Sequence, residues 1–138
     1  MKLFKSFVIF GLLLSATGCA SISRYDQYSY MQAVNLKVDS LKLMDSAGDA
    51  YSNHKPEVQD IKVRTEKAYE YEKGRPKNEV TTDMWKLMID PKGGLLGGFL
   101  VLWEESGTVS PAFVPEKKKQ IASGFDEIIS LESEKIKK

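Results

Sequence analysis

The sequence is poor in the residues that most often carry catalysis or bind metal: its 138 residues include one cysteine and one histidine. A lone cysteine excludes an internal disulfide, and zinc sites draw on several Cys, His or acidic ligands held together. The 20 Lys and Arg residues are balanced by 19 Asp and Glu residues, so no basic field steers the chain to nucleic acid. These scarcities argue against a metalloprotein, a disulfide-stabilised domain and a nucleic-acid-binding protein, and we expect no cofactor.

The one histidine, His54, stands in a predicted turn between two helices. Its neighbours Asn53 and Lys55 supply neither a catalytic triad nor a ligand cluster, so we expect a solvated turn histidine. The glycine pairs at 93–94 and 97–98 lack the G-x-x-x-x-G-K-[ST] pattern of a phosphate-binding loop. Loop flexibility or close helix packing explains these glycines better.

Two adjacent acids, Glu104 and Glu105, follow an apolar segment that ends at Trp103, and they are the nearest approach to a glycosidase-like pair. Such enzymes need two carboxyl groups roughly 5–10 Å apart across a cleft. Adjacent side chains point in different directions on a helix and to opposite faces of a strand. We therefore expect these acids to be solvated, and the protein not to be an enzyme.

Residues 1–18 follow the order of an export signal. Lys2 and Lys5 make a positive start, residues 7–14 form an apolar core, and the small residues 15–18 come next. That core is too short to span a bilayer as a helix, which takes about 20 residues. We therefore predict that residues 1–18 are a signal peptide that is recognised and then removed.

The small residues end on Ala16-Thr17-Gly18-Cys19, and here the chain resembles bacterial lipoprotein precursors. The lipobox of that family prefers an aliphatic residue three positions before the cysteine, where this chain has Ala16. The resemblance covers residues 1–20. It implies a diacylglycerol group on the Cys19 sulfur, cleavage before Cys19, and an acyl chain such as palmitate on the new amino terminus.

The residue after the lipobox cysteine indicates which membrane holds the lipoprotein. In the lipoprotein family an Asp at this position favours retention in the inner membrane, and this chain has Ala20. The resemblance therefore implies anchoring in the outer membrane, facing the periplasm. Two or three acyl chains hold a protein far more firmly than one, and lipidation removes the liability of a lone thiol in an oxidising compartment.

Removing 18 of the 138 residues leaves 120, with 18 basic and 19 acidic side chains because the signal carries two lysines and no acid. That length suffices for one domain with a single core. Residues 19–24 are short and polar, and we predict that they form the lipidated tether. Residues 25–138 are predicted to form a single helical domain.

Apolar residues recur at spacings of three and four from residue 25 to about residue 53, which predicts a first helix. Its expected buried side comprises Tyr30, Met31, Val34, Val38, Leu41, Met44, Gly48 and Tyr51. Stop and restart signals at 52–57 lead to a second helix over 56–73. The second helix is expected to bury Val58, Ile61, Ala68 and Tyr69. The two helices would form an antiparallel hairpin.

The rest of the chain predicts further helices, over 81–89 and over 115–137. The last is expected to bury Ile121, Phe125, Ile128, Ile129, Leu131 and Ile136. Between them, the apolar run 95–103 fits either a buried helix or a strand that turns into a β-hairpin around 99–114. The helix is favoured because the remainder is helical. The predicted fold class is all-α, a small helical bundle built on the antiparallel hairpin.

The sequence favours a non-enzymatic envelope lipoprotein that acts as an accessory, scaffold or inhibitor through contacts with an envelope protein. Two sets of residues are candidate contacts. Tyr25 and Tyr28 lie next to the tether, and Leu95, Leu96, Phe99, Leu100 and Trp103 lie in the apolar run. Exposed apolar patches usually mark interaction sites, although burial is the more common fate of such a run in a small domain.

The alternative function is a ligand-binding module for peptidoglycan fragments or lipid, with an aromatic cleft between the helices. A concave pocket with convergent polar groups would support it. A hydrolase ranks last, and two buried acids with raised pKa values in one cleft would revive that hypothesis.

Overall fold

The computed structural model describes residues 22–137, which form a bundle of helices. They are α1 Gln27–Met44, α2 Tyr51–Lys73, α3 Glu79–Ile89, α4 Leu96–Ser106 and α5 Val114–Glu134, with a short 3-10 helix at Lys135–Lys137. The described residues contain no strand. The predicted all-α class is therefore confirmed, and the alternative of a β-hairpin around 99–114 is wrong. Cys19 and the predicted signal peptide lie outside the described residues.

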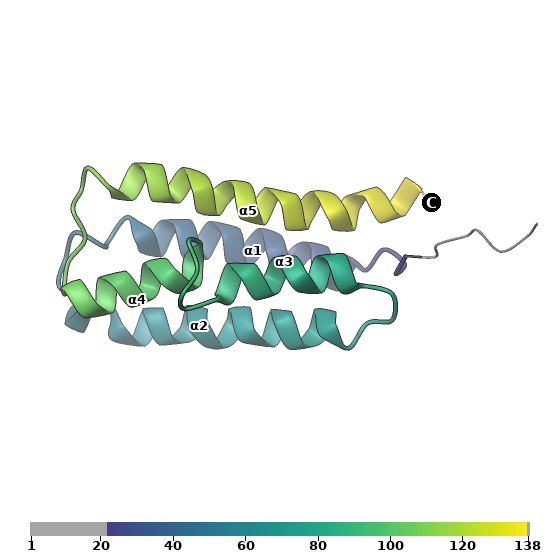
Figure 1. Ribbon diagram of the computed structural model, residues 1–138, viewed down its shortest axis with the longest axis horizontal. Coiled ribbons are helices and arrows are strands. Elements are labelled where there is room, and N and C mark those ends of the chain that lie inside the picture. The colour runs from purple at the N-terminus through teal and green to yellow at the C-terminus, as the bar shows by residue number, and fades with distance from the viewer. Residues whose placement is uncertain (1–21, 138) are drawn as a thin grey trace, which may run out of the picture.

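The helices form an antiparallel four-rod bundle in two layers, in which the third rod is broken into α3 and α4. Figure 1 shows α1 and α2 running in opposite directions, α3 and α4 following one another in one direction, and α5 returning beside α1. α1 packs against α2 and α5, and α3 packs against the same two helices from the other side. As a result, the described chain starts and finishes at the same end of the bundle (Figure 1).

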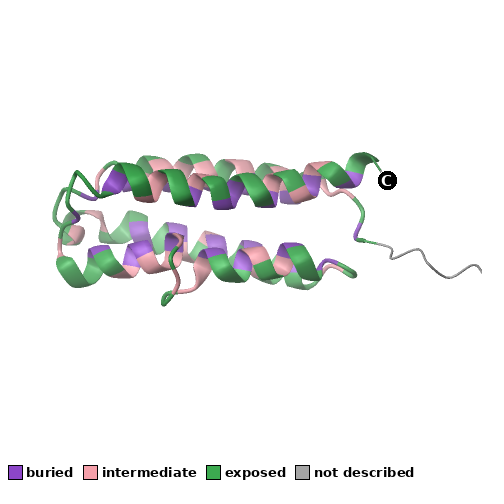
Figure 2. Cartoon of the chain, turned by 45° about the horizontal axis from the view of Figure 1, so that its top comes forward, coloured by how far each residue is buried: buried purple, intermediate pink, exposed green. Residues whose placement is uncertain are grey.

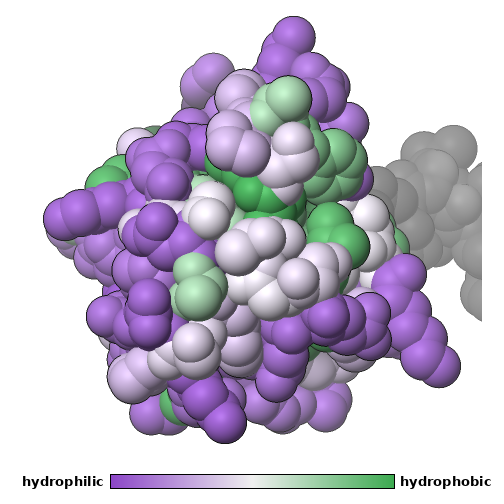
Figure 3. Space-filling model, turned by 90° about the vertical axis from the view of Figure 1, so that its left-hand side faces the viewer, coloured by the Kyte–Doolittle hydropathy of each residue, from purple (hydrophilic) through white to green (hydrophobic). Residues whose placement is uncertain are grey.

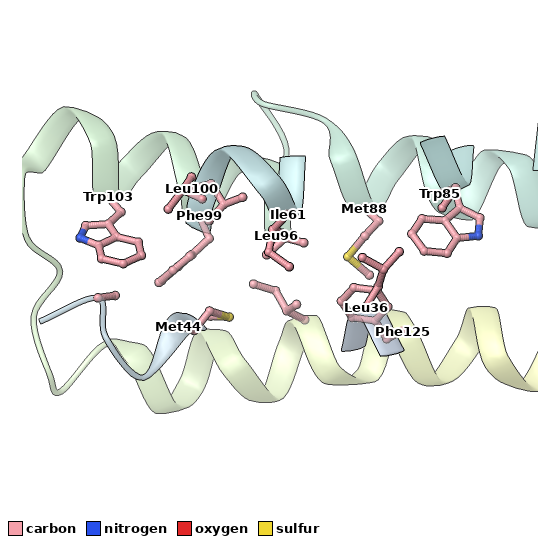
Figure 4. Packing of buried hydrophobic residues seen from close by; sticks show 14 of the residues in the cluster. Leu36, Met44, Ile61, Trp85, Met88, Leu96, Phe99, Leu100, Trp103 and Phe125 are labelled. Atoms are coloured by element: carbon pink, nitrogen blue, oxygen red, sulfur yellow. The ribbon is translucent and has the colours of Figure 1, made fainter. Parts of the chain in front are cut away.

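The core runs along the whole axis between the two layers of helices, where the buried residues of Figure 2 face one another. Its largest fully buried apolar side chains are Trp85, Trp103, Phe125, Leu36, Met44, Met88, Leu96, Leu100, Ile121 and Ile128. Trp85 and Trp103 mark opposite ends of this core (Figure 4). Trp85 meets Phe125 edge to face, with ring centroids 6.0 Å apart, a geometry that aromatic pairs prefer.

The first helix differs from the prediction in length and in the side it buries. It ends at Met44, and its buried residues are Ser29, Ala33, Leu36, Ser40 and Met44. Val38 and Met31, which were expected inside, are 58% and 45% exposed. Small residues at the buried positions let α1 lie close to its neighbours, so tertiary packing outweighs the hydrophobicity of single side chains here.

The second helix starts earlier than the cap signals at 52–57 predict. It begins at Tyr51, and Pro56 lies inside it. A tertiary contact explains the early start: the Tyr51 N–H donates to the Gly107 carbonyl at 2.7 Å, and the Tyr51 ring packs edge-on against Trp103. His54 therefore lies within α2, which corrects its placement in a turn. The predicted inward residues Val58, Ile61 and Ala68 are buried.

The break between α3 and α4 depends on two glycines at the start of α4. A Cβ atom on Gly97 would lie 2.3 Å from the Ile89 carbonyl oxygen, and one on Gly98 would lie 1.8 Å from the Gly93 carbonyl oxygen. Only a residue without a side chain fits at either position. These contacts fold the 90–95 loop tightly over the start of α4, and they confirm close packing as the reason for the glycine pair.

Candidate functional site

Buried polar side chains gather where the described chain begins and ends. Nine polar or charged residues are buried among residues 22–137, and seven belong to this end: Ser23, Ser29, Glu72, Asn78, Thr81, Glu132 and Lys135. Together with Arg75 we call them the terminal polar cluster. They come from the first described residues, the start of α1, the end of α2, the start of α3 and the end of α5. The cluster therefore ties the chain entering the bundle to four helices.

Glu132 is the centre of the terminal polar cluster. Its Oε1 accepts hydrogen bonds from the Asp26 N–H at 2.7 Å and from Arg75 Nη2 at 3.1 Å. Its Oε2 accepts from Arg75 Nη1 at 3.0 Å and from Lys135 Nζ at 2.6 Å. The guanidinium thus holds the carboxylate through two parallel bonds, which is the strongest arrangement for this pair.

Arg75 extends the cluster to α2 and to the entering chain. Its Nη1 also donates to Glu72 Oε2 at 2.8 Å and to Ser29 Oγ at 2.9 Å, and its Nη2 donates to the Arg24 carbonyl. Both carboxylates are almost fully buried, at 1% exposure each for Glu72 and Glu132. A buried carboxylate is tolerated only when it is paired and hydrogen-bonded, so the two acids depend on Arg75.

Asn78 fixes the first residues of the described chain. Its Oδ1 accepts hydrogen bonds from Ser23 Oγ at 2.8 Å and from Lys135 Nζ at 2.7 Å. The Ser23 N–H donates to the Lys77 carbonyl at 2.9 Å, and Ser23 is 6% exposed. Ser23 was expected in the tether at 19–24. The structure places it in the bundle, and the part of the predicted tether before the bundle is therefore shorter.

Asp26 joins the cluster to an aromatic pair on the surface. Its carboxylate caps α1 by accepting from the Ser29 N–H at 2.9 Å, and it accepts from the Tyr71 hydroxyl at 2.8 Å. Tyr71 in turn packs against Tyr28, with ring centroids 4.9 Å apart. Burial raises the pKa of Asp26, but the bonds from Ser29 and Tyr71 lower it by more. The hydrogen bond to Asp26 raises the pKa of Tyr71.

The cluster holds its central acid ionised. Burial alone raises the pKa of Glu132, but the hydrogen bonds from Arg75 and Lys135 outweigh burial and the net pKa is lowered. Burial lowers the pKa of Arg75, and the carboxylates of Glu132 and Glu72 raise it by more. A general acid at neutral pH needs a raised pKa instead. Glu132 therefore does not meet the condition of a raised pKa that would revive a hydrolase.

The lowered pKa values predict acid-sensitive stability. The folded-state pKa values of Glu132 and Asp26 lie below the ordinary values of 4.5 and 3.8. Their contribution is therefore complete above these ordinary values and is lost as the pH falls through the folded-state values. Urea unfolding followed across acidic pH should show a steep loss of stability that becomes shallower in Glu132→Gln. Glu127→Gln, an exposed change on the same helix, should keep the original slope; equal slopes in both variants would contradict the cluster's role.

The structure separates the predicted contact residues into two groups. Tyr25 and Tyr28 lie beside the terminal polar cluster, and Tyr28 is 58% exposed. In the apolar run, Leu96, Phe99, Leu100 and Trp103 are buried in the core at 0–3% exposure, while Leu95 is partly buried. These four side chains therefore do not form a contact surface, because α4 turns its apolar face onto the rest of the bundle.

An open groove runs along the outside of the bundle between α2 and the broken rod of α3 and α4. Its volume is about 850 Å³. The α2 wall is mainly polar, with Lys62, Thr65, Glu66 and Tyr69, and the other wall is largely apolar, with Leu87, Ile89, Pro91, Leu96, Leu100 and Val101. Asp83, Lys86 and Asp90 also line it. We call this surface the α2–α4 groove. From the apolar run 95–103, the buried Leu96 and Leu100 and the partly exposed Val101 line it.

His54 lies at the far end of the bundle from the terminal polar cluster. Its Nε2 is 3.2 Å from Asp49 Oδ2, and its ring is 5.5 Å from that of Trp103. Trp103 donates from Nε1 to the Asp49 carbonyl at 3.1 Å. These contacts close the turn between α1 and α2 over the core. The arrangement packs this end of the bundle.

Sequence reasoning missed the terminal polar cluster. Glu72 and Arg75, like Glu132 and Lys135, are spaced three apart on a helix, which is also the spacing of ordinary solvated ion pairs. The one available signal was the recurrence of this spacing at 72–75 and 132–135. Nothing in a single sequence states that the bundle brings the middle of the chain next to its two ends.

Among residues 22–137, no three His, Cys, Asp or Glu side chains are placed to hold a metal ion. None of the helices in that range has the length and hydropathy needed to cross a membrane. In comparisons with known proteins, the chain matches no family model, no curated protein and no solved structure at a significant level.

Proposed function

We propose that the chain is an outer-membrane lipoprotein, acylated at Cys19, whose periplasmic helical bundle acts as an accessory, scaffold or inhibitor of an envelope protein. The observation that carries this proposal is the position of the terminal polar cluster. Ser23, four residues after Cys19, is already tied into the bundle through Asn78 and the Lys77 carbonyl. A chain captured so soon after its anchor couples the bundle closely to the membrane.

Close coupling favours a role in binding at the membrane. A domain on a long flexible linker explores a wide volume, whereas a short connection confines it and raises its effective concentration for a partner in the same layer. The ionic cluster adds rigidity, because its bonds join the entering chain to the start of α3 and the ends of α2 and α5. Such a coupling suits a scaffold or inhibitor that must contact its target at a fixed distance from the membrane.

The α2–α4 groove is the surface best suited to protein contact. Leu87 stands in its apolar wall and is 56% exposed. Apolar side chains rimmed by charged ones are typical of interface cores, and Lys86 and Asp83 supply such a rim beside Leu87. The groove therefore replaces the buried face of α4 as the candidate contact surface.

The proposal is tested by crosslinking in intact cells followed by purification of the acylated protein. Leu87→Glu places a charge in the groove without touching the core, so the captured envelope protein should be lost while the melting temperature stays unchanged. Val38→Glu is the matched control, because Val38 is 58% exposed on α1 and lies outside the groove. Cys19→Ala should also lose the partner by releasing the anchor.

Two outcomes would count against this function. Capture of the same partner by the wild type and by Leu87→Glu would remove the groove from the interface. Recovery of lipid or glycan in place of a protein would favour the second candidate, a ligand-binding module. That candidate draws on the same groove, whose volume of about 850 Å³ lies within the range of small-molecule sites.

A further inference from the structure

Exposed apolar and aromatic side chains gather at the end of the bundle where the described chain begins and ends. In the part of the chain that the structure describes, eleven large hydrophobic residues are exposed, and five belong to this end: Ile22, Tyr28, Tyr71, Val80 and Ile136. Val80 and Ile136 are the most exposed of all eleven, at 65% each. They project from the first turn of α3 and from the 3-10 helix after α5. We call these five residues the terminal apolar rim.

The length of chain before Ser23 limits how far this rim can lie from the membrane anchor. Three residues separate Cys19 from Ser23, so their Cα atoms can be at most about 14 Å apart even in a fully extended chain. Ser23 itself is held in the bundle by Asn78 and the Lys77 carbonyl. Given the proposed acylation of Cys19, the rim must stay within a short distance of the lipid headgroups.

We propose that the terminal apolar rim docks on the lipid surface itself, so that the bundle stands end-on on the bilayer that holds its anchor. This inference rests on the proposed function, because it requires the acylated Cys19. It assigns Tyr28 to lipid contact rather than to a protein partner. The rim thereby gives the anchor a second point of attachment, which fixes orientation as well as location.

The chemistry of the rim fits the headgroup layer. Tyrosine is enriched at membrane–water interfaces because its ring is apolar and its hydroxyl is polar, and the Tyr28–Tyr71 pair offers two such rings. The basic side chains at this end, Arg24, Lys73, Lys77 and Lys137, are exposed beside the acids Glu70, Glu79 and Glu134. The charges nearly cancel, so apolar and aromatic contact carries the docking and dense anionic lipid is not required.

End-on docking fixes how far the other surfaces of the bundle lie from the lipid headgroups. α2 has 23 residues and is therefore about 35 Å long at 1.5 Å per residue. The far end, formed by the turn after α1 and the loop at 107–113, would lie about that distance from the headgroups. Figure 3 shows that this far end has hydrophilic side chains around a small pale and hydrophobic centre. The α2–α4 groove would face sideways, at mid-height above the membrane.

Site-directed spin labelling of the acylated protein tests this inference. Cys19 is the only cysteine, so once it is acylated a cysteine introduced at Val80, Ile136 or Ala112 is the only free thiol. Each variant is purified with its lipid, checked by intact mass, placed in vesicles of phosphatidylethanolamine and phosphatidylglycerol, and labelled with a nitroxide. Collision of the nitroxide with oxygen and with a water-soluble nickel chelate then reports depth. Ala112, exposed in the far loop, is the matched control.

We expect labels at 80 and 136 to collide several-fold less with the nickel chelate, and more with oxygen, than the label at 112. Circular dichroism should show the same helicity in all three variants. Equal nickel accessibility at the three positions, in protein that is acylated and vesicle-bound, overturns the docking inference and leaves the lipoprotein proposal standing. Protein that carries no acyl group and does not stay on the vesicles overturns both.

Discussion

Replacing Arg75 by methionine is expected to lower the free energy of unfolding by about 3–5 kcal/mol, the usual cost of leaving a buried charge without its partner. Of the side chains described, Arg75 alone hydrogen-bonds to both buried acids, Glu72 and Glu132. Methionine fills much of the same space but donates no hydrogen bond, and Lys135 reaches only Glu132 among the two acids. Urea unfolding followed by circular dichroism measures the loss.

The matched control for this change is Arg64→Met. Arg64 pairs with Asp39 and Asp60, but its side chain is 37% exposed, and exposed pairs contribute less than about 1 kcal/mol. A second measurement reports the entering chain directly: Arg75 donates to the Arg24 carbonyl, so trypsin should cut after Arg24 faster in Arg75→Met than in Arg64→Met. Equal stability and equal cleavage in the two variants would show that the cluster does not hold the entering chain.

Gly98→Ala is expected to destabilise the bundle by about 3 kcal/mol or more, at the upper end of the cost of overpacking. The added Cβ would lie 1.8 Å from the Gly93 carbonyl oxygen. That oxygen belongs to the backbone, so the 90–95 loop or the start of α4 must move to make room. Because α4 carries Trp103 and Leu100 into the core, we expect a large shift in the melting temperature together with a change in near-ultraviolet circular dichroism.

Gly94→Ala provides the control for the glycine argument, since a Cβ at this position meets no atom within 4 Å. We expect a change of less than about 1 kcal/mol, with any gain arising from a less flexible unfolded chain. Similar losses in Gly94→Ala and Gly98→Ala would mean that the close approach of α4 to the loop does not stabilise the fold.

The helical class and most of the helix limits could be predicted because local signals dominate them. Proline and glycine between 90 and 94 end α3, and the spacing of Val58, Ile61 and Ala68 places the inner face of α2. The run 95–103 had to be decided by context, since a short apolar run fits a buried helix and a strand equally well. Leu96, Phe99, Leu100 and Trp103 form no contact surface because α4 buries them in the core.

The buried side of α1 and the candidate site could not be predicted, for related reasons. Ser29 is buried because Arg75 donates to its hydroxyl, and Arg75 belongs to a segment 46 residues further along the chain. Val38 is more hydrophobic than Ser29, so the hydrophobic pattern predicts the wrong buried side for α1. A cluster made from the middle of a chain and from both of its ends depends on topology, and single-sequence patterns do not report topology.

We propose that an acylated Cys19 holds the terminal polar cluster close to a membrane. The measurement that tests it most directly is the intact mass of the protein purified from the membranes of a Gram-negative host expressing the full sequence. We expect the mass of residues 19–138 carrying a diacylglyceryl group and an amide-linked acyl chain, both on Cys19. An unacylated chain that retains residues 1–18, or a soluble protein with an unmodified Cys19, would contradict it.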